Sequence, residues 1–223
     1  ICLTLDLERD YGHFETYEAF ANLDDFLVLV EKYHLKLTVF TVGYLLEQRK
    51  DIIEKFRKAG AEFALHSYHH NLSKTDEDFK RQDILKAKET YLEYFNKAPL
   101  GYRAPRGAIS KFELDILQDQ GFQYDSSIFP YWRPGFYNNL QKPMIPFYWS
   151  NGLLEIPLSG LRFLRFPLSL SYIQFLGWNF YRFFLKLFGW PDLIISDIHL
   201  HNLKKTRGLK GAPWFARLFY LRN

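Results

Sequence analysis

The run HSYHH at residues 66–70 places imidazole side chains at positions i, i+3 and i+4. If the chain turns helically here, His66 and His70 share one face and can bind the same metal ion. Two neutral imidazoles and one carboxylate are a common ligand set for zinc, and they leave a coordination position open for water. A surface turn that is merely rich in histidine would give the same pattern. Polar residues elsewhere in the chain have to distinguish the two interpretations.

Polar side chains also follow four other predicted strands. In parallel α/β folds, functional side chains gather at the carboxyl ends of the strands. Each polar segment alone has an ordinary explanation, such as a helix N-cap or a surface charge. Their coincidence at one rim favours a metal-dependent active site. In chain order, the five segments begin at Asp6, His66, Arg103, Asp125 and Asp197.

These segments need a scaffold, and strand-like apolar runs alternate with runs of helical period over most of the chain. Repeated strand–helix units imply a parallel sheet, and about seven strands favour a barrel over an open sheet. No linker or repeat divides the sequence, so we expect one domain over residues 1–223. The predicted strands are 2–7, 36–42, 61–65, 100–103, 122–125, 153–157 and 193–200, and the predicted helices are 17–33, 44–59, 76–95 and 110–120.

Two segments fall outside this alternation. Residues 130–150 are rich in Pro, Tyr, Trp and Asn and are predicted to form a long loop suited to a substrate groove. Residues 170–188 are strongly apolar, but Asn179, Arg182 and Lys186 form a polar stripe that is costly in lipid. We therefore expect no transmembrane segment and a mostly buried barrel helix. An interfacial helix that approaches a membrane surface is the alternative.

The composition is that of a folded globular protein, with 48% hydrophobic and 24% charged residues. Aromatic residues reach 19%, which favours a carbohydrate ligand because flat rings stack on sugar faces, although such rings also fill cores. A net charge of +4 without a long basic block does not call for nucleic acid, and we expect no nucleic-acid partner. The single cysteine, Cys2, excludes an intrachain disulfide framework. No signal peptide precedes the first strand and both ends look trimmed, which leaves localisation open between the cytoplasm and the cell envelope.

In order and spacing, the motifs resemble those of the polysaccharide deacetylase family, the NodB-homology class. Residues 66–70 fit the family's His-Ser/Thr-x-x-His metal motif, residues 101–107 (GYRAPRG) fit its arginine motif, and residues 124–127 (YDSS) fit the next. The histidine-rich last strand fits the final motif. The resemblance covers essentially the whole chain. It implies a distorted (β/α) barrel with fewer than eight complete units and metal-dependent removal of acetyl groups from N-acetylated sugars.

The resemblance also implies a role for each matching residue. His66 and His70 would bind the metal, whereas the middle histidine of the motif, His69, would not. Asp6 would be the general base, and Arg103 would hold that base ionised because a nearby cation lowers a carboxylate pKa. The metal is expected to be zinc, with cobalt, manganese or nickel as alternatives. Residues expected at the substrate groove are Asp125, Ser126 and Trp132.

The first motif departs from the usual pattern of two adjacent aspartates, because Leu7 follows Asp6. Some family members carry an Asp-x-Glu form instead, and Glu8 matches it. We therefore assign Glu8 as the carboxylate ligand of the metal, with Asp10 as the alternative.

The last motif has two histidines where the family has one catalytic acid. His201, followed by Asn202, resembles the common His-Asp ending. His199 aligns with the ending found in the Asp-x-Glu subgroup. Because the first motif has that form, we favour His199 as the acid that protonates the leaving amine and keep His201 as the alternative.

Two other functions compete with glycan deacetylation. The same scaffold could hydrolyse another linear or cyclic amide, because fold and metal do not determine the substrate. The chain could also be a carbohydrate-binding relic without turnover, although the presence of Asp6 and of the terminal histidines argues against this. The natural substrate stays open among chitin-like oligomers, peptidoglycan, exopolysaccharide and lipid-linked glycans.

Overall fold

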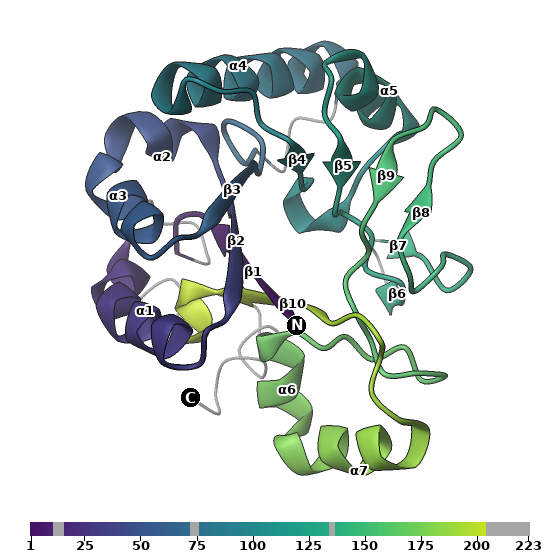
Figure 1. Cartoon of the computed structure of the whole chain (residues 1–223). Coiled ribbons are helices and arrows are strands. Elements are labelled where there is room, and N and C mark those ends of the chain that lie inside the picture. The colour runs from purple at the N-terminus through teal and green to yellow at the C-terminus, as the bar shows by residue number, and fades with distance from the viewer. Residues whose placement is uncertain (11–15, 72–75, 134–136, 204–223) are drawn as a thin grey trace.

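The computed structural model of the 223-residue chain describes residues 1–10, 16–71, 76–133 and 137–203. Its central feature is a curled eight-stranded sheet in the order β10-β1-β2-β3-β4-β5-β9-β8 (Figure 1). Neighbouring strands are parallel except for the antiparallel pair β8–β9. The sheet confirms the distorted (β/α) barrel, with seven parallel strands and one antiparallel edge strand. The strands of this sheet are β1 (Cys2–Leu7), β2 (Lys36–Thr41), β3 (Glu62–Leu65), β4 (Gly101–Tyr102), β5 (Tyr124–Asp125), β8 (Phe147–Tyr148), β9 (Leu154–Glu155) and β10 (Ile195–His199).

Helices follow the early strands and lie outside the curled sheet (Figure 1). The helices predicted over 76–95 and 110–120 match the structure to within one residue at each end, because Asp76 and Ser110 accept N-cap hydrogen bonds there. The helix predicted over 44–59 is broken at Arg49, and the one over 17–33 begins as a 3₁₀ turn. The helices are η1 (Glu18–Asn22), α1 (Leu23–Lys32), α2 (Gly43–Gln48), α3 (Lys50–Lys58), α4 (Glu77–Phe95), η2 (Pro105–Gly107), α5 (Lys111–Asp119), α6 (Leu170–Leu176), α7 (Trp178–Phe188) and η3 (Leu200–Asn202).

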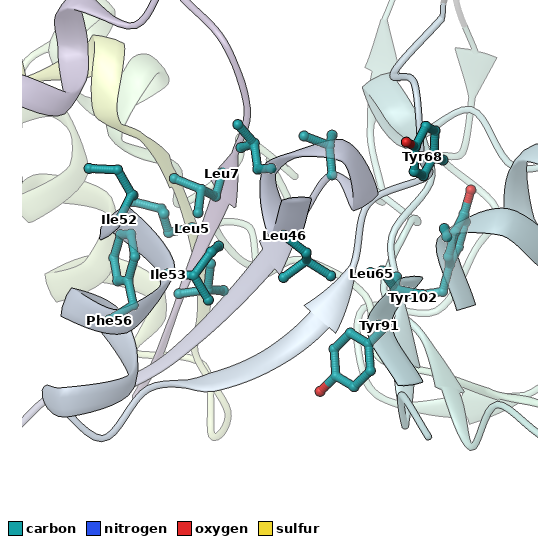
Figure 2. Packing of buried hydrophobic residues seen from close by; sticks show 14 of the residues in the cluster. Leu5, Leu7, Leu46, Ile52, Ile53, Phe56, Leu65, Tyr68, Tyr91 and Tyr102 are labelled. Atoms are coloured by element: carbon teal, nitrogen blue, oxygen red, sulfur yellow. The ribbon is translucent and has the colours of Figure 1, made fainter. Parts of the chain in front are cut away.

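Strand β1 separates the apolar core from the polar interior of the barrel. Leu5 and Leu7 are fully buried in the hydrophobic cluster that also contains Ile53 and Phe56 of α3 (Figure 2). Because strand side chains alternate, Asp6 points to the opposite face. Burying each leucine side chain stabilises the fold by about 1.5–3 kcal/mol. The core thus anchors the strand that carries the acidic residues.

The sheet is open between its end strands β8 and β10, and loop contacts close the remaining gap. After β9 the chain runs beside β10, where the Ser159 N–H donates to the Ile195 carbonyl oxygen at 3.0 Å. The Ser159 hydroxyl oxygen accepts from the Ile195 N–H at 2.9 Å and donates to the Leu193 carbonyl oxygen at 3.0 Å. The barrel is therefore completed by irregular chain.

Two predictions for the second half of the chain were wrong. Residues 130–150 are not one long loop, because they contain β6 (Trp132–Arg133), β7 (Tyr137–Asn138) and β8. Residues 170–188 are not one buried helix. Gly177, with a φ of 86°, separates α6 from α7; α6 buries no residue and α7 buries only Tyr181 and Leu185. No helix among the described residues is long and apolar enough to cross a membrane.

Candidate active site

Polar side chains from four strands meet at the carboxyl ends of the sheet. Asp6 lies near the end of β1, His66 follows β3, Arg103 follows β4, and His199 ends β10. The strand register places Asp6 directly opposite His199, so these two residues are brought together by pairing of the first and last strands of the sheet. Residues that are far apart in sequence thus share one site.

Glu8, His66 and His70 form a cluster with the spacing of a metal site. One ligand atom from each lies within 4.8 Å of the others, and the Glu8 Oε2 is 2.8 Å from the His70 Nε2. The His66 Nδ1 lies 2.8 Å from the Arg103 carbonyl oxygen, which can only accept, so Nδ1 carries the proton and Nε2 keeps its lone pair. Burial lowers the pKa of His66 to about 4, which keeps the ring neutral. One carboxylate and two imidazoles fit a divalent transition metal.

The histidine loop is not the helical turn that the spacing suggested. Ser67 and His70 have left-handed φ values of 63° and 51°, and the Ser67 hydroxyl oxygen accepts from the His70 N–H at 2.9 Å. This sharp bend still brings the His66 and His70 rings to 4.9 Å between centroids. The two histidines share a face because of loop geometry, not helical period.

Asp83 of α4 holds this loop in place, a role that no sequence pattern indicated. Its buried carboxylate accepts from the backbone N–H of Tyr68 at 2.8 Å and from that of His69 at 3.0 Å. The His69 Nδ1 lies 2.7 Å from the same carboxylate, and the His69 side chain is half exposed. His69 therefore faces α4 rather than the Glu8 cluster.

Arg103 is fully buried and joins the acidic residues of the site. Its Nη1 donates to Asp6 Oδ1 at 2.7 Å, to Asp197 Oδ1 at 3.2 Å and to Thr4 Oγ1 at 3.0 Å. Its Nε and Nη2 donate to the carbonyl and hydroxyl oxygens of Ser126. Burial alone would raise the pKa of Asp6, but Arg103 and the neighbouring histidines lower that pKa below its usual value. Asp6 is therefore ionised.

Asp6, Asp197 and His199 form a second cluster with metal-like spacing among the described residues. The Arg103 guanidinium already contacts both carboxylates, and its positive charge opposes a bound cation there. Burial and the nearby Asp6 raise the pKa of Asp197 to about 7. Sequence reasoning did not assign Asp197, although its place two residues before His199 on β10 puts both side chains on one face.

The two terminal histidines have different surroundings. The His199 side chain is 24% exposed, and its Nε2 lies 3.4 Å from Glu8 Oε1 and 3.7 Å from Asp6 Oδ2. Burial would lower the pKa of His199, but Asp197, Asp6 and Glu8 outweigh it and raise that pKa. His201 is only 3% exposed, and burial lowers its pKa to about 3, so its ring stays neutral. His199 is therefore the accessible member of the pair and the one whose ring is protonated more readily.

The structure places two expected groove residues in the interior. Asp125 and Ser126 are 0% and 2% exposed. Asp125 accepts from the hydroxyl and backbone N–H of Ser127, whose hydroxyl oxygen accepts from the Ala104 N–H beside Arg103. These contacts support the arginine segment and leave almost no surface for a ligand. Trp132 on β6 is 59% exposed, so its ring is open to a ligand.

Asp10, the alternative metal ligand, is occupied elsewhere. One carboxylate oxygen accepts from the Thr16 hydroxyl and the Glu18 N–H, and the other accepts from the Ala19 N–H. The side chain is buried, and it organises the start of η1. Glu8 and not Asp10 therefore accompanies the histidines.

Several known proteins are similar to this chain in sequence or in fold. A Helicobacter pylori peptidoglycan deacetylase is 34% identical over 107 residues, which is 46% of this chain and 35% of that protein. The alignments span 28% to 46% of the length of the curated relatives. Among solved structures, a presumed polysaccharide deacetylase from Mycobacterium smegmatis matches with a TM-score of 0.61 at 21% identity, covering 92% of this chain and 70% of the other. An allantoinase matches with a TM-score of 0.64 at 16% identity, covering 99% and 82%.

The family model of the polysaccharide deacetylases matches residues 11–124, just over half of the chain. The match includes the histidine loop and Arg103, whereas Glu8 and His199 lie outside it. The matched half carries two of the motifs, and the fold brings the remaining site residues to them. The chain therefore belongs to the polysaccharide deacetylase family.

Proposed function

We propose that this protein is a metal-dependent hydrolase that removes N-acetyl groups from an amino-sugar glycan and releases acetate. One observation carries the proposal: a Glu8–His66–His70 cluster that could hold a metal ion lies beside an ionised, arginine-bound aspartate and an accessible histidine. Amide hydrolysis needs an activated water, a base and an acid, and the cluster offers groups suited to each. The curated relatives named peptidoglycan deacetylases support a glycan substrate.

Glu8, His66 and His70 would hold the metal ion, with zinc as the expected metal. A bound divalent ion would polarise the amide carbonyl and lower the pKa of water toward 7. The His66 hydrogen bond to the Arg103 carbonyl fixes the ring tautomer and orients its free nitrogen toward the site.

Asp6 is suited to the role of general base. Its Oδ1 accepts from Arg103, which leaves Oδ2 facing the histidines, 3.8 Å from the His66 Nε2 and 3.7 Å from the His199 Nε2. The guanidinium keeps the carboxylate ionised, so Oδ2 can accept the proton of an attacking water.

His199 is suited to protonate the departing amine. Its Nδ1 lies 3.8 Å from Asp197 Oδ2, while Nε2 points toward Glu8 and Asp6. The surrounding carboxylates favour the charged imidazole, and an amine leaves poorly without a proton. The products are acetate and a free amino sugar.

Acetate release from N-acetylglucosamine oligomers and from peptidoglycan tests the proposal. Turnover should stop in a chelator and return with zinc. Asp6→Asn should lower turnover by about 10²–10⁴-fold while zinc content is kept, and Asp25→Asn, a change of an exposed acid on α1, should change neither. The combination of His66→Ala and His70→Ala should remove the metal.

Unchanged metal content in the double histidine variant would refute the ligand assignment. The shared fold of an allantoinase keeps hydrolysis of another amide as the second candidate. Chelator-sensitive hydrolysis of a cyclic amide, without acetate release from any glycan, would favour that candidate. Binding of glycan oligomers without any turnover would favour the relic.

A further inference from the structure

Helix α7 presents a regular exposed face. Phe183, Leu187 and Trp190 are 60%, 59% and 53% exposed, and Arg182 and Lys186 lie between them at the surface. Positions 182, 183, 186 and 187 recur with the spacing of one helical face, and Trp190 follows two residues after the end of the helix. The opposite face packs inward through Tyr181 and Leu185. In Figure 1, α7 lies at the lower edge of the molecule, away from the sheet.

A neighbouring loop adds an apolar side chain to this face. Phe163 is 81% exposed, and its ring lies 5.1 Å from the ring of Phe188 at the end of α7. Its φ of 63° is a left-handed conformation that costs free energy for a residue with a side chain. The loop thus holds a large, mostly exposed aromatic ring next to α7 and extends the exposed apolar surface there.

The chain segment that forms this face is basic up to Asp192. No acidic residue occurs between Glu155 and Asp192, whereas that stretch contains four arginines and lysines. Of these four, Arg165 donates to backbone carbonyls and Arg162 contacts Asp192. Arg182 and Lys186 are exposed on the α7 face itself. Aromatic rings interleaved with cations complement an anionic lipid surface, where rings enter the interface and long cationic side chains reach the headgroups.

We propose that this lipid-facing surface, formed by Phe163, Arg182, Phe183, Lys186, Leu187 and Trp190, docks on an anionic lipid bilayer. Helix α6 connects it to the site, because the Gln174 side chain donates to the Asn202 carbonyl oxygen at 2.9 Å, three residues after His199. Docking would hold the carboxyl end of β10 near the membrane. Binding of lipid does not depend on the proposed deacetylation.

Co-sedimentation with lipid vesicles tests this surface. The full chain should bind vesicles of equal parts phosphatidylcholine and phosphatidylglycerol, and bind pure phosphatidylcholine more weakly. Each cation near an anionic surface strengthens binding by about fivefold, so Arg182→Gln with Lys186→Gln should weaken binding to the mixed vesicles by about 25-fold. Phe183→Ser with Leu187→Ser should weaken binding to both kinds of vesicle.

Matched controls change exposed residues on other helices. Lys50→Gln with Lys58→Gln removes two cations from α3, and Leu29→Ser with Leu92→Ser removes two apolar side chains that are each 48% exposed. Both control variants should bind the mixed vesicles as the unaltered chain does. Circular dichroism checks folding, and the Arg182/Lys186 variant keeps the test valid if the apolar variant fails to fold.

The proposal is overturned if the unaltered chain binds neither kind of vesicle or if the α7 variants bind as tightly as the unaltered chain. It is overturned as well if the control substitutions weaken vesicle binding as much as the α7 substitutions do. It is also overturned by self-association that the Phe183→Ser with Leu187→Ser variant abolishes in the absence of vesicle binding, because that would assign the face to a second copy. Hydrolysis of soluble substrates should be unchanged in the Arg182/Lys186 variant, so failure here and failure of the proposed reaction are distinguishable.

Discussion

Asp83→Asn should weaken metal binding although Asp83 is not a proposed ligand. Its carboxylate accepts the Tyr68 and His69 backbone N–H groups at 2.8 and 3.0 Å and contacts the His69 ring. An asparagine keeps one acceptor oxygen, but its NH₂ group would face an N–H donor. The bend that brings His66 and His70 together would then lose support from α4.

The expected size follows from the hydrogen bonds that are lost. A hydrogen bond to a charged group contributes about 1.5–3 kcal/mol, and leaving a buried N–H without an acceptor adds to the loss. If about 2 kcal/mol of this loss appears in metal binding, affinity falls by about 30-fold. A loss of metal affinity of this size is typical when a residue that orients metal ligands is changed.

Competition for zinc against a chromophoric chelator would measure the change. Asp78→Asn is the matched control, because it alters an exposed aspartate on the same helix. His69→Ala removes only the ring contact with Asp83 and should lower zinc affinity by a few-fold at most. Zinc affinity equal to that of the unaltered protein in a folded Asp83→Asn variant would refute the reasoning, and so would an equal loss in His69→Ala.

Three further predictions address the general acid, the pH dependence of stability and the packing around Gly101. His199→Ala should lower turnover by about 10²–10⁴-fold, whereas His201→Gln should retain most turnover per folded molecule; acetate release would show the reverse if His201 is the acid. Without metal, thermal stability should fall as pH drops from about 6.5 toward 4 and below. Burial lowers the pKa of His66 to about 4 and that of His201 to about 3, so in this pH range the unfolded chain binds protons that the folded chain does not. A flat pH profile of melting temperature in chelator would contradict this. Gly101→Ala should destabilise the fold by about 1–3 kcal/mol in urea titration, since its Cβ would lie 2.0 Å from the Tyr124 ring. A change well under about 1 kcal/mol would mean that the ring can move aside.

The scaffold was predictable where local pattern and burial agree. The β1 segment alternates between core-facing leucines and inward polar residues, and its predicted limits match the structure. Strands β4 and β5 are only two residues long, shorter than their apolar runs, because few ladder hydrogen bonds form in this curled part of the sheet. Apolar content indicated their position but not how far pairing extends.

The other parts of the fold and of the site depend on tertiary contacts that local sequence does not encode. Helix α7 has apolar side chains on both faces, so its pattern could not show that Tyr181 faces inward while Phe183 faces outward. Asp83 is one of many acids on the predicted helices, and only the packing of α4 against the histidine loop distinguishes it. Asp125 matches a family motif, yet its complete burial could not be inferred from the motif.

The pairing of β1 with β10 has a consequence for how the protein is made. Cys2 pairs with Ile195 and Asp6 with His199, so one flank of β1 stays unpaired until the last strand of the sheet has emerged from the ribosome. At about 5–20 residues per second, that interval is about 10–40 s. During this time Arg103 can meet Asp6 but not Asp197, and a nascent chain lacks the proposed acid. Catalytic competence would therefore be acquired in a single late step, and shorter translation products would be inert.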